Sequence, residues 1–188
     1  MEVIKINVLN KPLLILTETK APIKELLELG TYKNEVMILL KEALKLYKNA
    51  LVIDMIEESP FFTFYANALG FRSIYLSNKN KKIFAKNNIV NNSNLTHFIE
   101  PTKFNNTIKG KKIAYLLIDN IKKIKYCLRP IRTGNIHNII IFGPSKLENF
   151  NLHDILIKAG YSFINHKNFY HFKHSNACSP PPFILRFD

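Results

Sequence analysis

The segment Ala50–Leu76, ALVIDMIEESPFFTFYANALGFRSIYL, decides the fold. Its first residues, ALVID, form an apolar run ending in the carboxylate of Asp54, a pattern typical of a strand buried on both faces. Ser59 and Pro60 predict a helix start, because serine is a favoured N-cap and proline suits the first helical position. Gly70 predicts the helix end, and a second apolar run follows. This order of strand, helix and strand predicts a βαβ unit and a parallel sheet.

The ends of these two strands are where functional residues are expected. In a doubly wound parallel sheet, ligands bind at the carboxyl ends of the strands. In this chain, that edge contains the residues from Asp54 to Pro60 and those that follow Leu76.

Similar patterns recur along the rest of the chain. Apolar runs predict sheet strands at 50–54, 72–77, 95–99, 112–118 and 137–142, and an antiparallel hairpin at 161–173. Helical spacing predicts helices at 21–29, 34–47, 121–128 and 152–159, and a further basic helix after Leu76, whereas 102–111 is predicted to be a polar connector. The predicted fold class is therefore α/β, a Rossmann-like, doubly wound, mainly parallel sheet with a C-terminal antiparallel hairpin.

Composition narrows the class of protein. A chain of 188 residues can bury a full core, and no apolar stretch reaches the roughly 20 residues that a transmembrane helix needs. The N-terminus lacks the pattern of a signal peptide, so we expect an intracellular, cytoplasmic protein. The two cysteines, Cys127 and Cys178, are too few for a disulfide framework or a zinc site. His166, His171 and His174 do not have metal-ligand spacing either, so no metal is expected.

The net charge of +13 has two explanations. A lysine-rich surface around Lys79–Lys86 and Lys109–Lys125 could contact nucleic acid or a protein assembly. Alternatively, A/T-biased codons raise lysine together with asparagine and isoleucine. The excess is nearly all lysine, whereas phosphate-binding sites tend to use arginine, which favours the codon explanation.

The stretch VIDMIEESPFFTFYANALGF, followed by a strand, a Lys/Asn-rich helix and NNIVNN, resembles the FkbM-type methyltransferases, a branch of the class I S-adenosylmethionine-dependent fold. That family carries an aspartate at a strand end, then Gly-Ala-Asn-x-Gly, a helix that begins with aromatic residues, and a second strand ending in Glu-Pro. Asp54 matches the aspartate, and Phe61, Phe62 and Thr63 match the helix start. The resemblance covers roughly Tyr32 to His174. The resemblance places a methyltransferase-like domain at 32–174, and the residue patterns outside it predict an N-terminal hairpin and short helix at 1–31 and a Pro-rich tail at 175–188.

The chain departs from the family at most of its cofactor positions. Ile56 and Pro60 stand where the glycines belong, and Ser77 stands where the ribose-binding acid is expected. Glu58 adds negative charge where the carboxylate of the cofactor would lie, and Asp119 keeps a strand-end acid without its usual neighbours. The positions that match the family's cofactor site, most of them degenerate, are therefore Asp54, Ile56, Glu58, Pro60, Ser77 and Asp119.

Three functional hypotheses follow. The leading one is a degenerate pseudoenzyme that acts as a binding or scaffold module without a cofactor. The alternative is an active S-adenosylmethionine-dependent methyltransferase of unknown acceptor, with Asp54 and Asp119 near the cofactor. A basic RNA-associated protein is the third. For a degenerate site, we expect Ile56 to occupy or cover the cofactor volume, and Ser59 to cap the helix that begins at Pro60.

Overall fold

The structure is a computed structural model that describes residues 2–17, 34–47, 49–57, 59–142, 150–166 and 169–175. The predicted helix at 21–29, Glu58 and the Pro-rich tail after residue 175 lie outside these residues.

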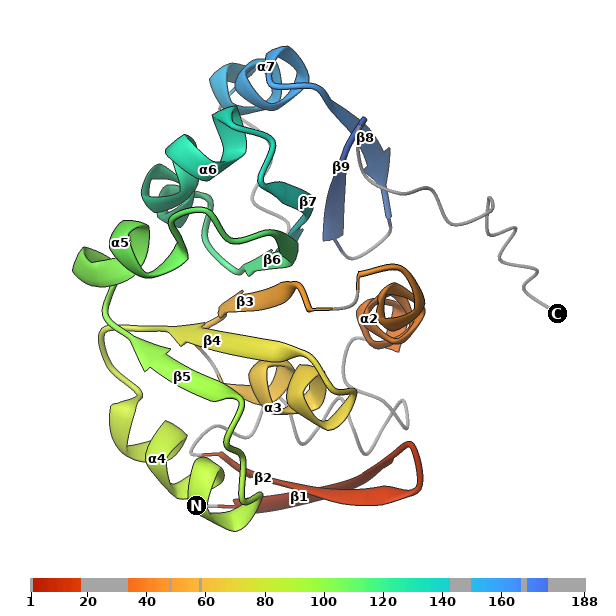
Figure 1. Cartoon of the computed structure of the whole chain (residues 1–188), viewed down its shortest axis with the longest axis vertical. Coiled ribbons are helices and arrows are strands. Elements are labelled where there is room, and N and C mark those ends of the chain that lie inside the picture. The colour runs from red at the N-terminus through yellow and green to blue at the C-terminus, as the bar shows by residue number, and fades with distance from the viewer. Residues whose placement is uncertain are drawn as a thin grey trace, which may run out of the picture.

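The core of the molecule is a seven-stranded sheet with the order β5-β4-β3-β6-β7-β9-β8 (Figure 1). Strands β5, β4, β3, β6 and β7 are parallel, whereas β9 is antiparallel to both β7 and β8. The predicted fold class and its C-terminal hairpin are therefore confirmed. The bounds are β3 (Leu51–Met55), β4 (Arg72–Leu76), β5 (Thr96–Ile99), β6 (Ile113–Ile118), β7 (Ile136–Phe142), β8 (Tyr161–Asn165) and β9 (Phe169–His174).

Helices cover both faces of this sheet. One face carries the first core cluster, to which α2, α3 and α4 contribute, and the other carries a second cluster, to which α5, α6 and α7 contribute. The bounds are α2 (Asn34–Leu46), α3 (Phe61–Ala68), α4 (Lys81–Val90), α5 (Phe104–Ile108), α6 (Leu128–Arg132) and α7 (Phe150–Lys158), with two 3-10 helices, η1 (Pro101–Lys103) and η2 (Ile121–Cys127).

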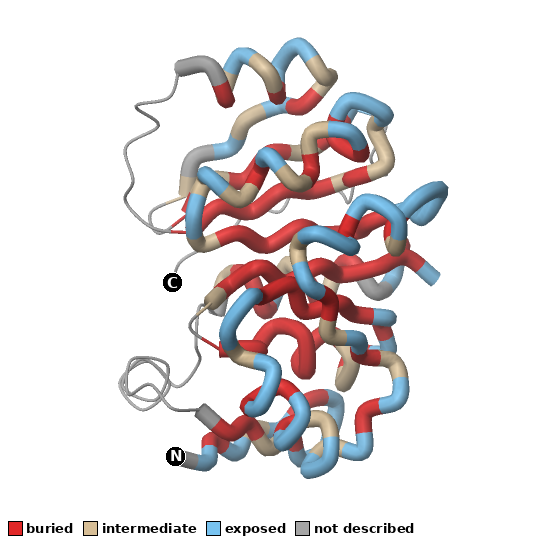
Figure 2. The backbone as a smooth tube through the Cα atoms, turned by 90° about the vertical axis from the view of Figure 1, so that its left-hand side faces the viewer, coloured by how far each residue is buried: buried red, intermediate tan, exposed pale blue. Residues whose placement is uncertain are grey.

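Strand β3 shows why the apolar run predicted a central strand. All five of its residues are buried, and Figure 2 shows the central strands as nearly continuous buried segments. Side chains alternate across a strand. Val52 accordingly joins the first cluster, whereas Ile53 and Met55 join the second. Both faces of the sheet are therefore buried, as a doubly wound arrangement requires.

The N-terminal hairpin packs against helices α3 and α4. Strands β1 (Glu2–Val8) and β2 (Lys11–Thr17) are antiparallel and are joined by Leu9 and Asn10, whose φ angles are 48° and 64°. Positive φ at both residues is what a two-residue hairpin turn with native twist needs. Apolar side chains of the hairpin, including Ile15, belong to the first core cluster together with α3. The predicted hairpin is therefore confirmed.

Two local predictions were wrong. The stretch predicted as a polar connector forms η1 and α5, because Phe104 and Ile108 are buried and hold a short helix against the second cluster. The basic helix predicted at 121–128 is instead the 3-10 helix η2 followed by α6, with Pro130 inside α6. Proline is tolerated there because the first turn of a helix does not use its missing N–H. No helix in the described part of the chain is long and apolar enough to cross a membrane.

Candidate functional site at the crevice between β3 and β6

The strand order reverses between β3 and β6. From β3 the chain proceeds to β4 and β5 on one side, and then crosses to β6 and β7 on the other. In open α/β sheets, the crevice at such a reversal, outside the carboxyl ends of the strands, is where ligands bind. The structure brings Asp54, Ile56, Pro60, Ser77 and Asp119 to this edge, on or next to the ends of β3, β4 and β6, and Glu58 lies outside the described residues.

Asp54 is fully buried at the end of β3. One carboxylate oxygen, Oδ1, accepts a hydrogen bond from the Ile56 amide at 3.0 Å. The other, Oδ2, accepts from the amide and the hydroxyl of Thr63 at 2.9 and 3.0 Å. Burial raises the pKa of Asp54 to about 7, although these hydrogen bonds lower it. Asp54 therefore satisfies amides of the loop and of the first turn of α3.

The predicted cap of α3 was wrong. The helix begins at Phe61 with Pro60 as the N-cap residue, and no side chain makes the cap hydrogen bond. Ser59 is buried, and its hydroxyl has no hydrogen-bond partner among the described residues. The carboxylate of Asp54 reaches Thr63 in the first turn instead, so an acid nine residues earlier takes the place that a serine cap would fill.

Ile56 packs its side chain in the core, and its backbone groups form hydrogen bonds that hold the loop. Its side chain is 1% exposed and belongs to the first core cluster, together with Phe61 and Phe62. Its amide donates to Asp54, and its carbonyl oxygen accepts from the Tyr75 hydroxyl at 3.0 Å. The loop after β3 is therefore built around a large buried side chain where a glycine-rich loop would leave space for a ligand.

Ser77 holds the loop that leads into α4. It is 2% exposed, and its hydroxyl oxygen accepts from the amides of Lys79 and Asn80 at 3.1 and 3.4 Å. The side-chain amide of Asn80 donates in turn to the Glu57 carbonyl and to the Tyr75 hydroxyl. The hydroxyl at the end of β4 is therefore already engaged in internal hydrogen bonds.

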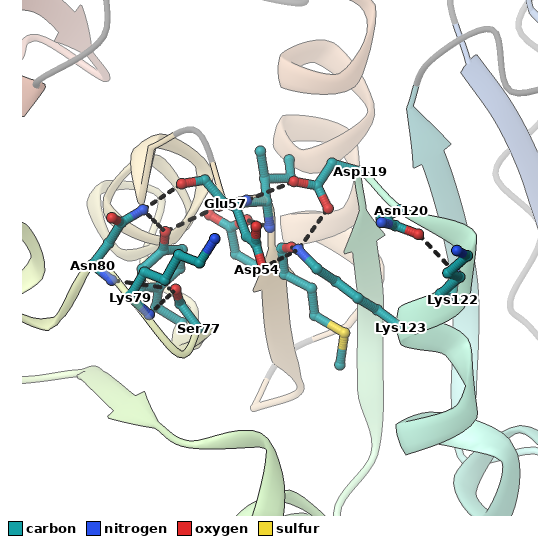
Figure 3. A network of polar contacts seen from close by, with 12 residues as sticks. Asp54, Glu57, Ser77, Lys79, Asn80, Asp119, Asn120, Lys122 and Lys123 are labelled. Atoms are coloured by element: carbon teal, nitrogen blue, oxygen red, sulfur yellow. Dashed lines mark hydrogen bonds and ion pairs between the residues drawn. The ribbon is translucent and has the colours of Figure 1, made fainter.

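Lys123 bridges the reversal point itself (Figure 3). Its ammonium lies 2.6 Å from Asp119 Oδ1, at the end of β6, and donates to the carbonyl of Met55, at the end of β3. Glu57 Oε1 lies 3.5 Å from the same ammonium, and the Glu57 amide donates to Asp119 Oδ2 at 2.6 Å. The Lys123 side chain is only 15% exposed. We call Lys123, Asp119, Glu57 and Met55 the crevice bridge.

The sequence indicated Asp119 as a site residue, whereas it placed Lys123 only in the lysine-rich stretch Lys109–Lys125. The available signal was their spacing, because an acid and a lysine four residues apart across a helix start are commonly paired. That spacing gives no indication that the same ammonium also reaches a carbonyl 68 residues earlier. The contact depends on the pairing of β3 with β6, which the local sequence does not specify.

The sulfonium and the ribose of S-adenosylmethionine can each be compared with the residues at this edge. Its sulfonium is a cation, whereas the crevice bridge places an ammonium between β3 and β6. Its ribose hydroxyls need a carboxylate, whereas Ser77 supplies a hydroxyl that two amides already use. The residues present do not fit this cofactor.

The remaining titratable candidates lie elsewhere. His171 pairs through Nε2 with Asn138 Oδ1 at 3.0 Å, and burial lowers its pKa to about 4. Cys127 is buried in the second cluster, and its burial raises the pKa of the thiol. Within the described ranges, no group of three or more His, Cys, Asp or Glu side chains could hold a metal ion.

Comparison with known proteins gives a match in structure alone. No protein-family model matches the chain, and no curated protein matches it in sequence. A SAM-dependent methyltransferase from Agrobacterium tumefaciens aligns over 92% of this chain and 70% of its own, with a TM-score of 0.57 and 12% identity.

Two further solved structures align in the same way. The precorrin-6y C5,15-methyltransferase from Geobacter metallireducens GS-15 has a TM-score of 0.54 and 12% identity over 75% of this chain and 88% of its own. The ribosomal protein L11 methylase from Lactobacillus delbrueckii subsp. bulgaricus has a TM-score of 0.52 and 14% identity over 76% of this chain and 78% of its own. At these identities the alignments establish that the chain has the class I methyltransferase fold.

Proposed function

We propose that this chain is a degenerate methyltransferase-fold protein of the FkbM type that acts as a binding module without S-adenosylmethionine. The observation that carries the proposal is the crevice bridge, in which the Lys123 ammonium lies between the Met55 carbonyl and the Asp119 carboxylate. The Lys123 ammonium thus occupies the carboxyl ends of β3 and β6, which is where a protein of this fold is expected to bind its ligand.

Electrostatics supports the same conclusion. Two unit charges of like sign at about 4 Å repel by roughly 4 kcal/mol in the effective dielectric of a protein surface. A sulfonium beside Lys123 would meet this repulsion, which the carboxylates of Asp119 and Glu57 offset only in part because both already pair with the ammonium. Removing Lys123 from the crevice would also leave the Met55 carbonyl without this donor.

The loops support the proposal independently of charge. Binding of a nucleoside cofactor depends on close backbone approach, which glycines permit. Here the corresponding loop carries the core side chain of Ile56 and the buried ring of Pro60. Its carbonyl groups at Ile56 and Glu57 accept hydrogen bonds from Tyr75 and Asn80. The loop is therefore fixed by its own contacts.

Titration calorimetry with S-adenosylhomocysteine tests the proposal. We expect no binding heat at micromolar to millimolar ligand for the unmodified protein, with folding verified by circular dichroism on the same sample. Saturable binding at micromolar ligand would overturn the proposal. In that case, Asp119→Asn should weaken binding if the acid contacts the cofactor.

The second candidate is an active S-adenosylmethionine-dependent methyltransferase. It is favoured by the acids that stand at the ends of β3 and β6, Asp54 and Asp119, and by the names of the structural neighbours. In this case, Lys123 would have to leave the crevice before a cofactor entered. The same titration separates the two candidates, because only the active protein is expected to bind S-adenosylhomocysteine, the product of methyl transfer.

A further inference from the structure

The opposite edge of the sheet, at the amino ends of its parallel strands, concentrates positive charge. Arg72 begins β4, three lysines lie in the loop that joins α5 to β6, and Arg129 lies in α6. All five side chains are exposed. We call this set the basic edge: Arg72, Lys109, Lys111, Lys112 and Arg129.

Strand β6 separates the basic edge from the crevice. Its six residues are all buried and run from the loop of Lys112 to Asp119. Six residues of a strand span about 20 Å. The lysine-rich stretch that the sequence suggested as one surface, Lys109–Lys125, is therefore two surfaces. Lys109–Lys112 belong to the basic edge, whereas Lys123 belongs to the crevice bridge at the other edge.

Two hollows lie along the basic edge. The larger has a volume of about 470 Å³, and its charged lining residues are Arg72, Lys111 and Lys112. The smaller has a volume of about 130 Å³ and is lined by Lys109 and Arg129. The other lining residues are uncharged side chains or His97, and they include Asn49 and Asn94 in the larger hollow.

The positive charge of this edge is not compensated within the described part of the chain. No Asp or Glu lines either hollow. None of the five cations of the basic edge forms an ion pair with a described acid. By contrast, the crevice lysine is paired with Asp119 at 2.6 Å. An anion that reaches the basic edge therefore meets cations that no described acid has neutralised.

The loop that presents the three lysines is ordered by backbone hydrogen bonds. The Lys111 amide donates to the Ile108 carbonyl at 3.0 Å across Gly110, whose φ of +73° is accessible to glycine without strain. The Lys112 carbonyl accepts from the Leu51 amide of β3 at 3.1 Å. The backbone positions of the lysines are therefore set before any ligand arrives, which reduces the backbone entropy lost on binding.

We propose that the basic edge binds the phosphodiester backbone of single-stranded RNA. Two adjacent cationic hollows that share one loop suit a chain of phosphates, whereas a single small anion would occupy only one of them. Lysine ammonium groups and the forks of Arg72 and Arg129 are suitable phosphate donors. The larger hollow also offers the side-chain amides of Asn49 and Asn94 to an unstacked base. This proposal concerns the opposite edge of the sheet and does not depend on the crevice being closed.

Fluorescence polarisation with a labelled oligouridine tests this proposal. We expect binding at low salt that weakens steeply as salt is added, because each neutralised phosphate of a single strand contributes a slope of about −0.7 in log affinity against log salt. The variant Lys109→Gln/Lys111→Gln/Lys112→Gln should reduce the magnitude of that slope by about 2. Uridine monophosphate should not compete at concentrations at which the unlabelled oligomer does.

The matched control is Lys79→Gln/Lys81→Gln/Lys82→Gln, which removes the same charge from exposed lysines near the other edge. It should leave the slope nearly unchanged, and replacing the three loop lysines with arginine should preserve binding. Equal losses in the two glutamine variants would overturn a site at the basic edge. Absence of binding by the unmodified protein at low salt would overturn it too, as would full competition by the mononucleotide.

Discussion

At Asp54, burial and hydrogen bonding act in opposite directions on the carboxyl group. Burial removes the charged form from water and raises the pKa to about 7, whereas three donors from Ile56 and Thr63 favour the carboxylate. His171 shows the reverse case, because its burial lowers its pKa to about 4. The two groups should therefore affect the pH dependence of stability with opposite signs.

The sign for Asp54 follows from proton counts. Between about pH 4 and pH 7 the folded protein keeps the Asp54 proton while the unfolded chain loses it, so this group makes the protein less stable as pH rises. His171 makes it more stable as pH rises from about 4 to 6.5, because only the unfolded chain binds that proton. Asp54→Asn should therefore cost more stability near pH 4 than near pH 7.

Urea unfolding across this range provides the measurement, and His171→Asn provides the contrast. We expect the difference between wild type and Asp54→Asn to shrink with rising pH by on the order of 1 kcal/mol per pH unit. For His171→Asn, the difference should grow with rising pH. A penalty for Asp54→Asn that is constant across the range would contradict the assignment of a raised pKa.

The Lys123 ammonium donates both to the Met55 carbonyl at the end of β3 and to the Asp119 carboxylate after β6. The Lys123→Met variant keeps most of the apolar length of the side chain but leaves the Asp119 carboxylate and the Met55 carbonyl without this donor. The site is partly buried, so the cost should lie between those of exposed and buried pairs, at about 1–2 kcal/mol. Lys122→Met is the matched control, because Lys122 is the exposed neighbour on the same 3-10 helix. Equal unfolding free energies for the two variants would show that the crevice bridge contributes nothing to stability.

Among the elements, α4 holds the N-terminal hairpin through two asparagines. The side-chain amide of Asn87 accepts from the Leu16 amide at 2.7 Å and donates to the Leu16 carbonyl at 2.9 Å. One helical turn later, Asn91 makes the same pair of bonds to Leu14. Leu14 and Leu16 are two apart on β2, so their backbone groups point the same way and meet residues four apart on a helix. The two asparagines thereby bond the N–H and C=O groups of Leu14 and Leu16, which lie on the open edge of β2 and could otherwise pair with a further strand.

Asn87→Ala should therefore loosen the hairpin. Asn87 is fully buried, so its removal leaves one N–H and one C=O of Leu16 unpaired, at a cost of at least about 2 kcal/mol. Ile89→Ala is the control on the same helix, because Ile89 is 79% exposed and its loss should change stability by less than about 0.5 kcal/mol. Urea unfolding measures both variants, and hydrogen exchange at the Leu16 amide should accelerate only in Asn87→Ala. Unchanged exchange there would mean that the asparagine clamp does not hold β2.

The start of α3 shows what a local pattern can and cannot predict. The helix was predicted correctly, because Phe61 to Leu69 are apolar apart from Thr63 and Asn67, and Gly70 follows with a φ of 93°. Its cap was predicted wrongly. A serine next to a proline is a favourable local signal for an N-cap, but the Thr63 amide in the first turn donates to Asp54 at the end of β3 instead. A cap supplied from a neighbouring strand leaves no local signal in the sequence.

At the scale of the whole molecule, the sequence predicted the order of strands and helices within one or two residues of most bounds. Buried parallel strands require long apolar runs, so β3, β6 and β7 stand out from the polar segments around them. The pairs that build the crevice join residues as far as 68 positions apart, so only the folded sheet reveals them. The sequence also did not show that the lysines divide between the two edges, because that division depends on the direction of β6.

The two edges of the sheet therefore differ in how far their polar and charged groups are paired. At the carboxyl edge, polar groups of the loops after β3, β4 and β6 bond to one another, and the crevice bridge joins β3 to β6. At the amino edge, the basic edge leaves its cations exposed around two hollows. The methyltransferase fold ordinarily receives its ligand at the carboxyl edge, so these exposed cations lie at the edge opposite to it.

A crystal structure determined after growth in millimolar S-adenosylhomocysteine is the sharpest test of whether the crevice bridge excludes the cofactor. We expect the Lys123 ammonium to lie within hydrogen-bonding distance of both the Met55 carbonyl and Asp119, with no ligand density at the carboxyl ends of β3 and β4. S-adenosylhomocysteine bound in that crevice, with Lys123 displaced from both partners, would contradict it.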